Sequence, residues 1–251
     1  MNWWTYAVLL DENPTDSATA LTRHLVAAGL SWRPKWALDV HGEEVVVRES
    51  LEETLHLLGE LGGGGTTIWA RDDAIGLDFD VSRRTVGISS PASLRTGVEG
   101  ESVDLLLRTA FRWLCEKSGA RYGSSEDLYA TENIWHQYGV SRLDSVWTVE
   151  REDLQRGVVP EVVPWLSYFD TRLFPLARAL FSDVEGANVE SVGSSGILVR
   201  LADWPWEGAF AVRTGQGYVV VDAYGRNESG RRNQPIGLNR ILDEAKRSAH
   251  P

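Results

Sequence analysis

Short apolar runs of strand length alternate along this chain with stretches whose apolar residues recur every three or four positions. The first run, residues 3–10, is aromatic and aliphatic and predicts a strand. Residues 66–70, 75–81 and 85–89 repeat this pattern with short polar turns between them, which favours an antiparallel meander. Residues 36–48 indicate one bent strand or a hairpin, broken at a His-Gly dipeptide.

Helical periodicity follows three start signals in the N-terminal part. Asn13 precedes a proline and can cap a helix that begins there. Ser50 and Glu53 have the spacing of a capping box. Ser102 precedes the clearest helical pattern of the chain, and a shorter helical piece is expected at 131–138.

The C-terminal part mixes the same two patterns. A charged patch and two prolines between residues 150 and 164 change the character of the chain, so we place a boundary at about residue 150. Beyond an aromatic segment at 165–169, the pattern predicts a helix at 175–181 and strands at 189–192, 196–201, 209–214 and 217–223. The last helix would carry Leu238, Ile241, Leu242 and Ala245 on one face.

These elements predict an α+β fold. Strands grouped in runs between helices favour mixed or antiparallel sheets with helices packed on one face, arranged as two lobes, 1–150 and 151–251.

Composition narrows the class of protein. The chain has 251 residues, 43% of them hydrophobic, and no run of about 20 apolar residues that would span a membrane. The N-terminus lacks the features of a signal peptide, and we expect a cytoplasmic protein. The single cysteine, Cys115, lies in an apolar helical pattern and is expected to be a small buried hydrophobic residue.

Negative charge is concentrated in the first part of the chain. Residues 1–150 hold 13 Lys and Arg against 23 Asp and Glu, a net charge of −10, whereas residues 151–251 hold 12 against 13. An acidic surface repels nucleic acid and anionic lipid and attracts basic proteins, although solubility alone also explains it. The predicted acidic face consists of Glu43, Glu44, Asp72, Asp73, Asp78 and Asp80.

Candidate chemistry is sparse. Strand alternation would place Asp78 and Asp80 on one face, where they could bind a divalent cation, act as an acid–base pair, or simply face water. The five histidines have no metal-binding spacing, and residues 193–196 (Gly-Ser-Ser-Gly) have the pattern of a turn, not of a nucleophile elbow. We therefore predict no catalytic residue, metal or cofactor.

Two tryptophans flank a proline in a probable loop. Trp204 and Trp206 are costly to leave in water, so they either pack inward or serve as anchors for a partner. The Arg-rich segment 226–233 lacks interleaved aromatic residues and is expected to be a surface loop, not a nucleic-acid contact.

Three segments carry a family resemblance. Residues 164–169 (Pro-Trp-Leu-Ser-Tyr-Phe), 193–198 (Gly-Ser-Ser-Gly-Ile-Leu) and 201–206 (Leu-Ala-Asp-Trp-Pro-Trp) resemble bacterial immunity proteins of polymorphic toxin systems, in particular the family numbered fifty-two. The resemblance covers about a fifth of the chain. It implies an α+β cytoplasmic protein that binds and neutralises a cognate toxin, often a nuclease.

Three functions remain open at this point. The first is a non-enzymatic protein whose acidic face occludes the basic surface of a toxin. The second is a metal-dependent hydrolase that uses Asp78 and Asp80. The third is a scaffold protein that belongs to no toxin system.

Overall fold

The computed structural model describes residues 3–30, 37–38, 43–45, 49–61, 65–69, 75–91, 98–127, 130, 149, 151–204, 207–214 and 217–222. Contacts between Cα atoms divide the chain into two compact units, Met1–Gly123 and Ser124–Pro251. The division falls within strand β7 (Tyr122–Asp127) and not near residue 150, where the sequence placed it. The charged and proline-bearing stretch that suggested the later boundary instead forms helix α5 (Arg151–Gln155) and strand β8 (Val162–Pro164) of unit 2.

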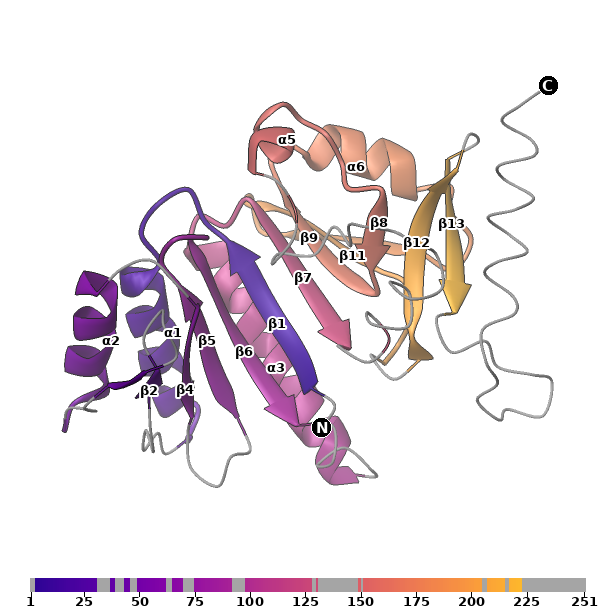
Figure 1. Cartoon of the computed structure of the whole chain (residues 1–251). Helices are drawn as coiled ribbons and strands as arrows, with labels where there is room; N and C mark the ends of the chain where they lie inside the picture. The colour runs from indigo at the N-terminus through magenta and orange to yellow at the C-terminus, as the bar shows by residue number, and fades with distance from the viewer. Residues whose placement is uncertain are drawn as a thin grey trace. The chain divides into compact units, whose positions relative to one another are not determined.

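Unit 1 is built on an antiparallel sheet (Figure 1). Its neighbouring strands follow the order β7-β1-β6-β5-β4-β2-β3. Besides β7 these are β1 (Trp3–Leu9), β2 (Ala37–Leu38), β3 (Glu44–Val45), β4 (Gly65–Trp69), β5 (Gly76–Asp80) and β6 (Thr85–Pro91). The predicted meander β4-β5-β6 is confirmed, and the pairing of Ala37 with Val45 confirms the hairpin.

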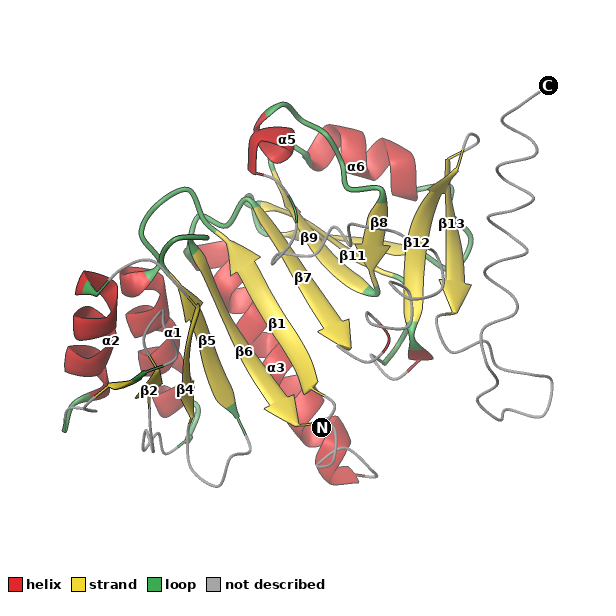
Figure 2. Cartoon of the chain, viewed as in Figure 1, coloured by secondary structure: helices red, strands yellow, loops and turns green. Residues whose placement is uncertain are grey.

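Helices α1 (Thr15–Ala27), α2 (Leu51–Glu60) and α3 (Val98–Lys117) complete unit 1. Helix α3 lies against β1 and β6, α1 lies against β5 and β6, and α2 packs on α1 (Figure 2). The side chains of Tyr6 and Val8 on β1 and of Leu77 and Phe79 on β5 are fully or almost fully buried. The predicted α+β fold with helices on one face is thus confirmed.

The start of α3 differs from the prediction. The helix begins at Val98, one turn before Ser102. The pattern did not reveal this first turn, since the residues Val-Glu-Gly-Glu do not continue the apolar spacing of the helix. The same helix buries a charged residue, since Asp104 accepts a hydrogen bond from the Tyr6 hydroxyl and lies 2.5 Å from Arg108 Nη2. A buried carboxylate needs such partners to offset its lost hydration.

Strand β7 has no counterpart in the predicted elements. Its sequence, Tyr-Gly-Ser-Ser-Glu-Asp, is polar, yet all six residues are buried. Ser124 donates to Glu126 Oε1 at 3.0 Å, and Ser125 accepts from Trp165 Nε1 at 3.0 Å. Hydrogen bonds of this kind make the burial of polar side chains tolerable, and hydrophobic patterning does not reveal them.

Unit 2 contains two groups of antiparallel strands and helix α6 (Phe174–Phe181). One group has the order β10-β11-β9 and the other β13-β12-β8. Their remaining bounds are β9 (Leu166–Asp170), β10 (Asn188–Val192), β11 (Gly196–Arg200), β12 (Ala209–Thr214) and β13 (Gly217–Asp222). These elements confirm the strands predicted in this half and the turn at Gly193, whereas the helices expected at 131–138 and near Leu238 lie outside the described residues.

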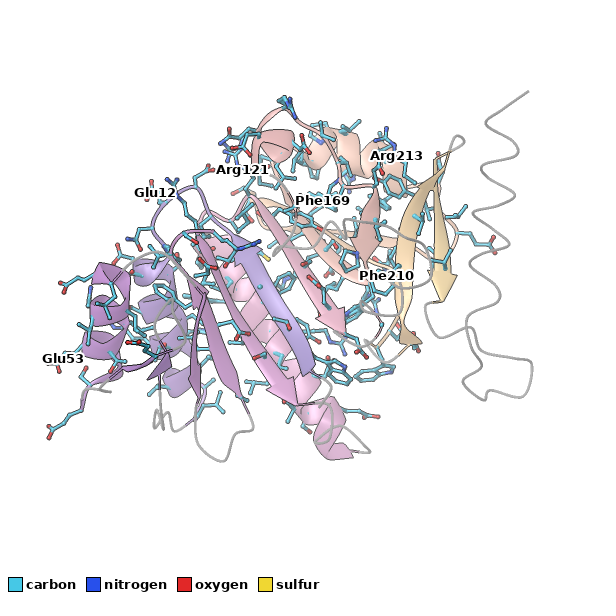
Figure 3. All side chains as sticks on the ribbon, in the orientation of Figure 1. Glu12, Glu53, Arg121, Phe169, Phe210 and Arg213 are labelled. Carbon is cyan, nitrogen blue, oxygen red and sulfur yellow. The ribbon has the colours of Figure 1, made fainter. Side chains whose placement is uncertain are left out.

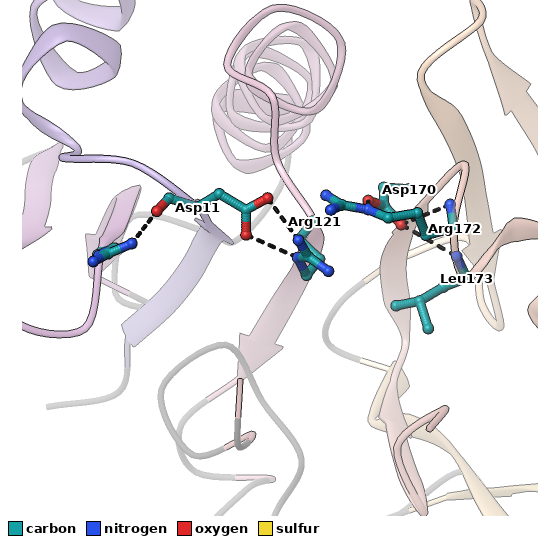
Figure 4. Close-up of polar contacts among 6 residues, drawn as sticks. Asp11, Arg121, Asp170, Arg172 and Leu173 are labelled. Atoms are coloured by element: carbon teal, nitrogen blue, oxygen red, sulfur yellow. Dashed lines mark hydrogen bonds and ion pairs between the residues drawn. The ribbon is translucent and has the colours of Figure 1, made fainter. Parts of the chain in front are cut away.

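An arginine joins two distant segments of unit 1. Arg121 Nε and Nη2 donate to the two carboxylate oxygens of Asp11 at 2.9 and 2.6 Å (Figure 4). In addition, Arg121 N donates to Leu9 O at 2.9 Å. Arg84, in the turn between β5 and β6, donates to the backbone oxygen of Asp11. These contacts fix the point where β1 ends and the chain turns toward α1.

Replacing Arg121 with alanine tests this junction. The Arg121 side chain is 8% exposed, and its loss would leave Asp11 without its bidentate partner, so R121A should lower the free energy of unfolding by about 2 kcal/mol. Urea unfolding measures the change. Arg23→Ala is the matched control, because the Arg23–Glu52 pair is exposed and its removal should barely move the midpoint. Equal effects of the two variants would contradict the role given to Arg121.

Burial lowers the reactivity of the Cys115 thiol. The residue is fully buried on α3, as predicted, and this burial raises the pKa of its thiol well above the ordinary value. Because the thiolate is the reactive form, a water-soluble thiol reagent should leave Cys115 unmodified in the folded protein and modify it fully in guanidinium. Rapid modification of the native protein at neutral pH would show that α3 opens readily.

Candidate partner-binding surface

The structure separates the acidic residues nominated from the sequence. Glu43 is exposed just before β3. Glu44 lies in β3, where its backbone pairs with Leu38. Asp72 and Asp73 lie outside the described residues.

The aspartates of β5 do not form an exposed pair. Asp80 is 6% exposed, and its Oδ1 accepts from Ser82 Oγ at 2.8 Å and from Arg83 N at 2.9 Å. Asp78 is half-buried opposite Gly87 of β6. Asp80 therefore stabilises the turn into β6, and its burial contradicts the expectation that it lies on an exposed face.

The two tryptophans differ in what the structure describes. Trp204 is half-buried in the bend after β11, where its backbone oxygen accepts from Glu207 N at 3.2 Å. Trp206 lies outside the described residues. The nearby Arg200–Asp203 ion pair, at 2.6 Å, holds the start of this bend.

Helices α1 and α2 run in opposite directions and approach closely. A Cβ on Gly59 of α2 would lie 2.5 Å from Thr15 Oγ1 at the start of α1. At the other end, Arg23 Nε lies 2.6 Å from Glu52 Oε1. The inner sides of the pair are apolar, with Leu21, Leu25, Leu55 and Leu58 all buried.

Sequence signals set the start of each helix. Asn13 Oδ1 accepts from Thr15 N at 2.9 Å and from Thr15 Oγ1 at 2.7 Å, which confirms Asn13 as the residue that caps α1. Ser50 Oγ accepts from Glu53 N at 3.4 Å, which confirms the predicted cap of α2. Both helices thus begin where side-chain oxygens meet otherwise unpaired backbone N–H groups.

Exposed carboxylates collect on the outer side of this helix pair. Within 11–27 and 49–60 the only Lys or Arg is Arg23, and five exposed acidic residues make no ion pair with any described residue. They are Glu12, Asp16, Glu49, Glu53 and Glu60. We call this set the α1–α2 acidic surface. Figure 3 shows Glu53 projecting from the outer side of α2.

The two ends of the α1–α2 acidic surface follow from the helix contacts. Because Thr15 meets Gly59, Asp16 and Glu60 lie at one end. Glu49 and Glu53 lie at the end where Arg23 bonds Glu52. The pKa of Glu52 is lowered, first by its hydrogen bond from Arg23.

Sequence reasoning did not nominate the α1–α2 acidic surface, for a physical reason. It favoured pairs that are adjacent in the sequence, such as those of β5, whereas the α1–α2 acidic surface brings together segments more than 30 residues apart. A signal was present, because the polar faces of both predicted helices carry acidic residues and almost no Lys or Arg.

Two further observations concern metal binding and membrane spans. Within the described ranges, no three His, Cys, Asp or Glu side chains are placed to hold a metal ion. Among the described helices, none combines the length and apolar character that crossing a bilayer requires.

No family model, curated protein or solved structure matches this chain. The resemblance to immunity proteins stays a prediction.

A double-mutant cycle tests the close approach of α1 and α2. Gly59→Ala should destabilise the protein by about 1–2 kcal/mol, because the new methyl group would collide with Thr15, whose hydroxyl is held by Asn13. In a Thr15→Ala background the same change should stabilise the protein by about 0.5–1 kcal/mol, the usual gain from replacing a helical glycine with alanine. Urea unfolding of the four proteins gives the coupling, and additive effects would show that the helices do not touch at this point.

Proposed function

We propose that this protein is a non-enzymatic binding protein that neutralises a cognate toxin by covering a basic surface on it. The observation that carries the proposal is the α1–α2 acidic surface, with five exposed carboxylates that form no ion pair with a described residue, against the single Arg23 of these two segments, which is itself paired with Glu52. The resemblance of three C-terminal segments to immunity proteins points to the same class of function.

Electrostatics favours a basic partner. At physiological ionic strength a charge acts over about 8 Å, so neighbouring carboxylates at each end of the helix pair add their potentials and form an acidic patch. Such a patch accelerates association with a surface rich in Lys and Arg and disfavours acidic partners. A nuclease presents a surface of that kind because it must neutralise the phosphates of its substrate.

Packing supplies rigidity and apolar contacts. Helix α1 lies against β5 and β6 and buries Leu21 and Leu25, so little conformational freedom of its backbone is lost on binding. Val26 is 52% exposed near the end of α1, and Leu61 is 47% exposed just after α2. These two side chains offer apolar contact beside the carboxylates, in the way that interface anchors slow dissociation.

Charge reversal on the helices tests the proposal. The protein is co-expressed in bacteria with the product of the reading frame next to its gene, and the intact chain should restore growth. The triple variant Asp16→Lys, Glu53→Lys and Glu60→Lys should lose this protection, because it turns the patch positive. The control variant Asp183→Lys and Glu185→Lys reverses exposed charges of unit 2 and should still protect.

Purified proteins give the matching physical measurement. The association rate of the intact pair should fall about tenfold or more between low and high salt. The triple variant should associate slowly at every salt concentration, while its circular dichroism matches that of the intact chain. Undiminished protection by the folded triple variant would remove the α1–α2 acidic surface from the mechanism.

A further inference from the structure

His56 lies midway along helix α2, between the carboxylates at the two ends of the α1–α2 acidic surface. The residue is exposed and makes no hydrogen bond, ion pair or ring contact with any described residue. Glu52 and Glu53 lie four and three positions before it, and Glu60 lies four positions after it. Helical residues at this spacing are neighbours, with about 5–6 Å between their Cβ atoms. The imidazole therefore has three carboxylates of its own helix around it.

The charge of His56 acts on these neighbours. The pKa of Glu52 is lowered first by its hydrogen bond from Arg23, and the charge of His56 contributes to the same shift. The imidazole is thus within electrostatic reach of the carboxylate that joins α2 to α1. A proton taken up by His56 adds positive charge within the acidic surface.

Helix α1, which packs against α2, adds two charged groups to this environment. Arg23 is already held in its ion pair, and Asp16 lies at the opposite end of the helix pair. His24 of α1 points elsewhere, because its ring stacks on Trp113 of α3 with 4.6 Å between the ring centroids. Since an arginine stays charged, His56 is the described group of this surface whose charge changes near neutral pH.

We propose that protonation of His56 weakens the binding of a basic partner to the α1–α2 acidic surface. Histidine is the side chain whose charge ordinarily changes between about pH 5 and pH 8. A positive charge among the carboxylates reduces their negative potential, and a bound Lys- or Arg-rich surface in turn disfavours uptake of the proton. Binding and protonation therefore compete. The inference rests on the proposed function, because it concerns the regulation of the same surface.

Two substitutions that fix the charge at position 56 test this competition. His56→Gln is neutral and His56→Lys is positive at both pH 8 and pH 6, and an exposed position tolerates either change. The probe is a rhodamine-labelled peptide of ten arginines, whose charge is constant over this range. Fluorescence anisotropy at low salt gives its dissociation constant from each full-length protein, and circular dichroism at both pH values confirms that the three proteins are folded.

The intact protein should change from the behaviour of one variant to that of the other. At pH 8 it should bind the peptide as His56→Gln does, whereas His56→Lys should bind about threefold more weakly. At pH 6 the intact protein should bind about threefold more weakly than His56→Gln and come within about twofold of His56→Lys. Because all three proteins carry the same carboxylates, comparing them at one pH removes the effect of carboxylate titration.

The failure of this inference is distinguishable from the failure of the proposed function. If His56→Lys weakens binding but the intact protein and His56→Gln bind alike at pH 6, the regulatory role of His56 is overturned and the acidic surface remains the binding site. If His56→Lys binds as tightly as the intact protein at both pH values, the peptide does not bind at the α1–α2 acidic surface, and the proposed function is overturned together with this inference.

Discussion

The bidentate bond between Arg121 and Asp11 is the constraint on which the arrangement of unit 1 depends. It joins the end of β1 to the segment that leads from α3 into β7, across 110 positions of sequence. Arg84 adds a third segment by binding the backbone of Asp11. Two hydrogen bonds to a carboxylate have a defined direction as well as strength, so they set the angle at which the chain leaves the sheet.

The position of the α1–α2 acidic surface follows from the direction in which the chain leaves β1. Helix α1 starts four residues after Asp11, buries Leu21 and Leu25 against neighbouring elements, and receives α2 where Gly59 allows close approach. Apolar contacts thus fix the inner sides of both helices. The carboxylates lie away from these buried sides and therefore face water. The proposed binding surface is a consequence of core packing, which makes it rigid before any partner arrives.

The buried carboxylates of unit 1 have a different role from the exposed ones. Asp104 is fully buried, where Tyr6 and Arg108 bind it, and Asp80 is turned into its own loop by Ser82 and Arg83. Both carboxylates stabilise the local structure, and neither is exposed to solvent. The net charge of the first 150 residues therefore overstates how many carboxylates a partner could meet, and the α1–α2 pair carries five of the exposed ones among the described residues.

The sequence by itself determined the class of fold and most element positions, because period-two and period-3.6 patterns and capping residues such as Asn13 and Ser50 act over a few residues. Only the tertiary structure decided that polar β7 is a buried strand and that Asp104 lies in the core, since their partners Trp165 and Tyr6 come from remote segments. The same holds for the candidate surface. Its acidic residues were visible in two helices, but their meeting depends on the burial of apolar side chains between remote segments and on the close approach of Thr15 to Gly59, which local patterns do not encode.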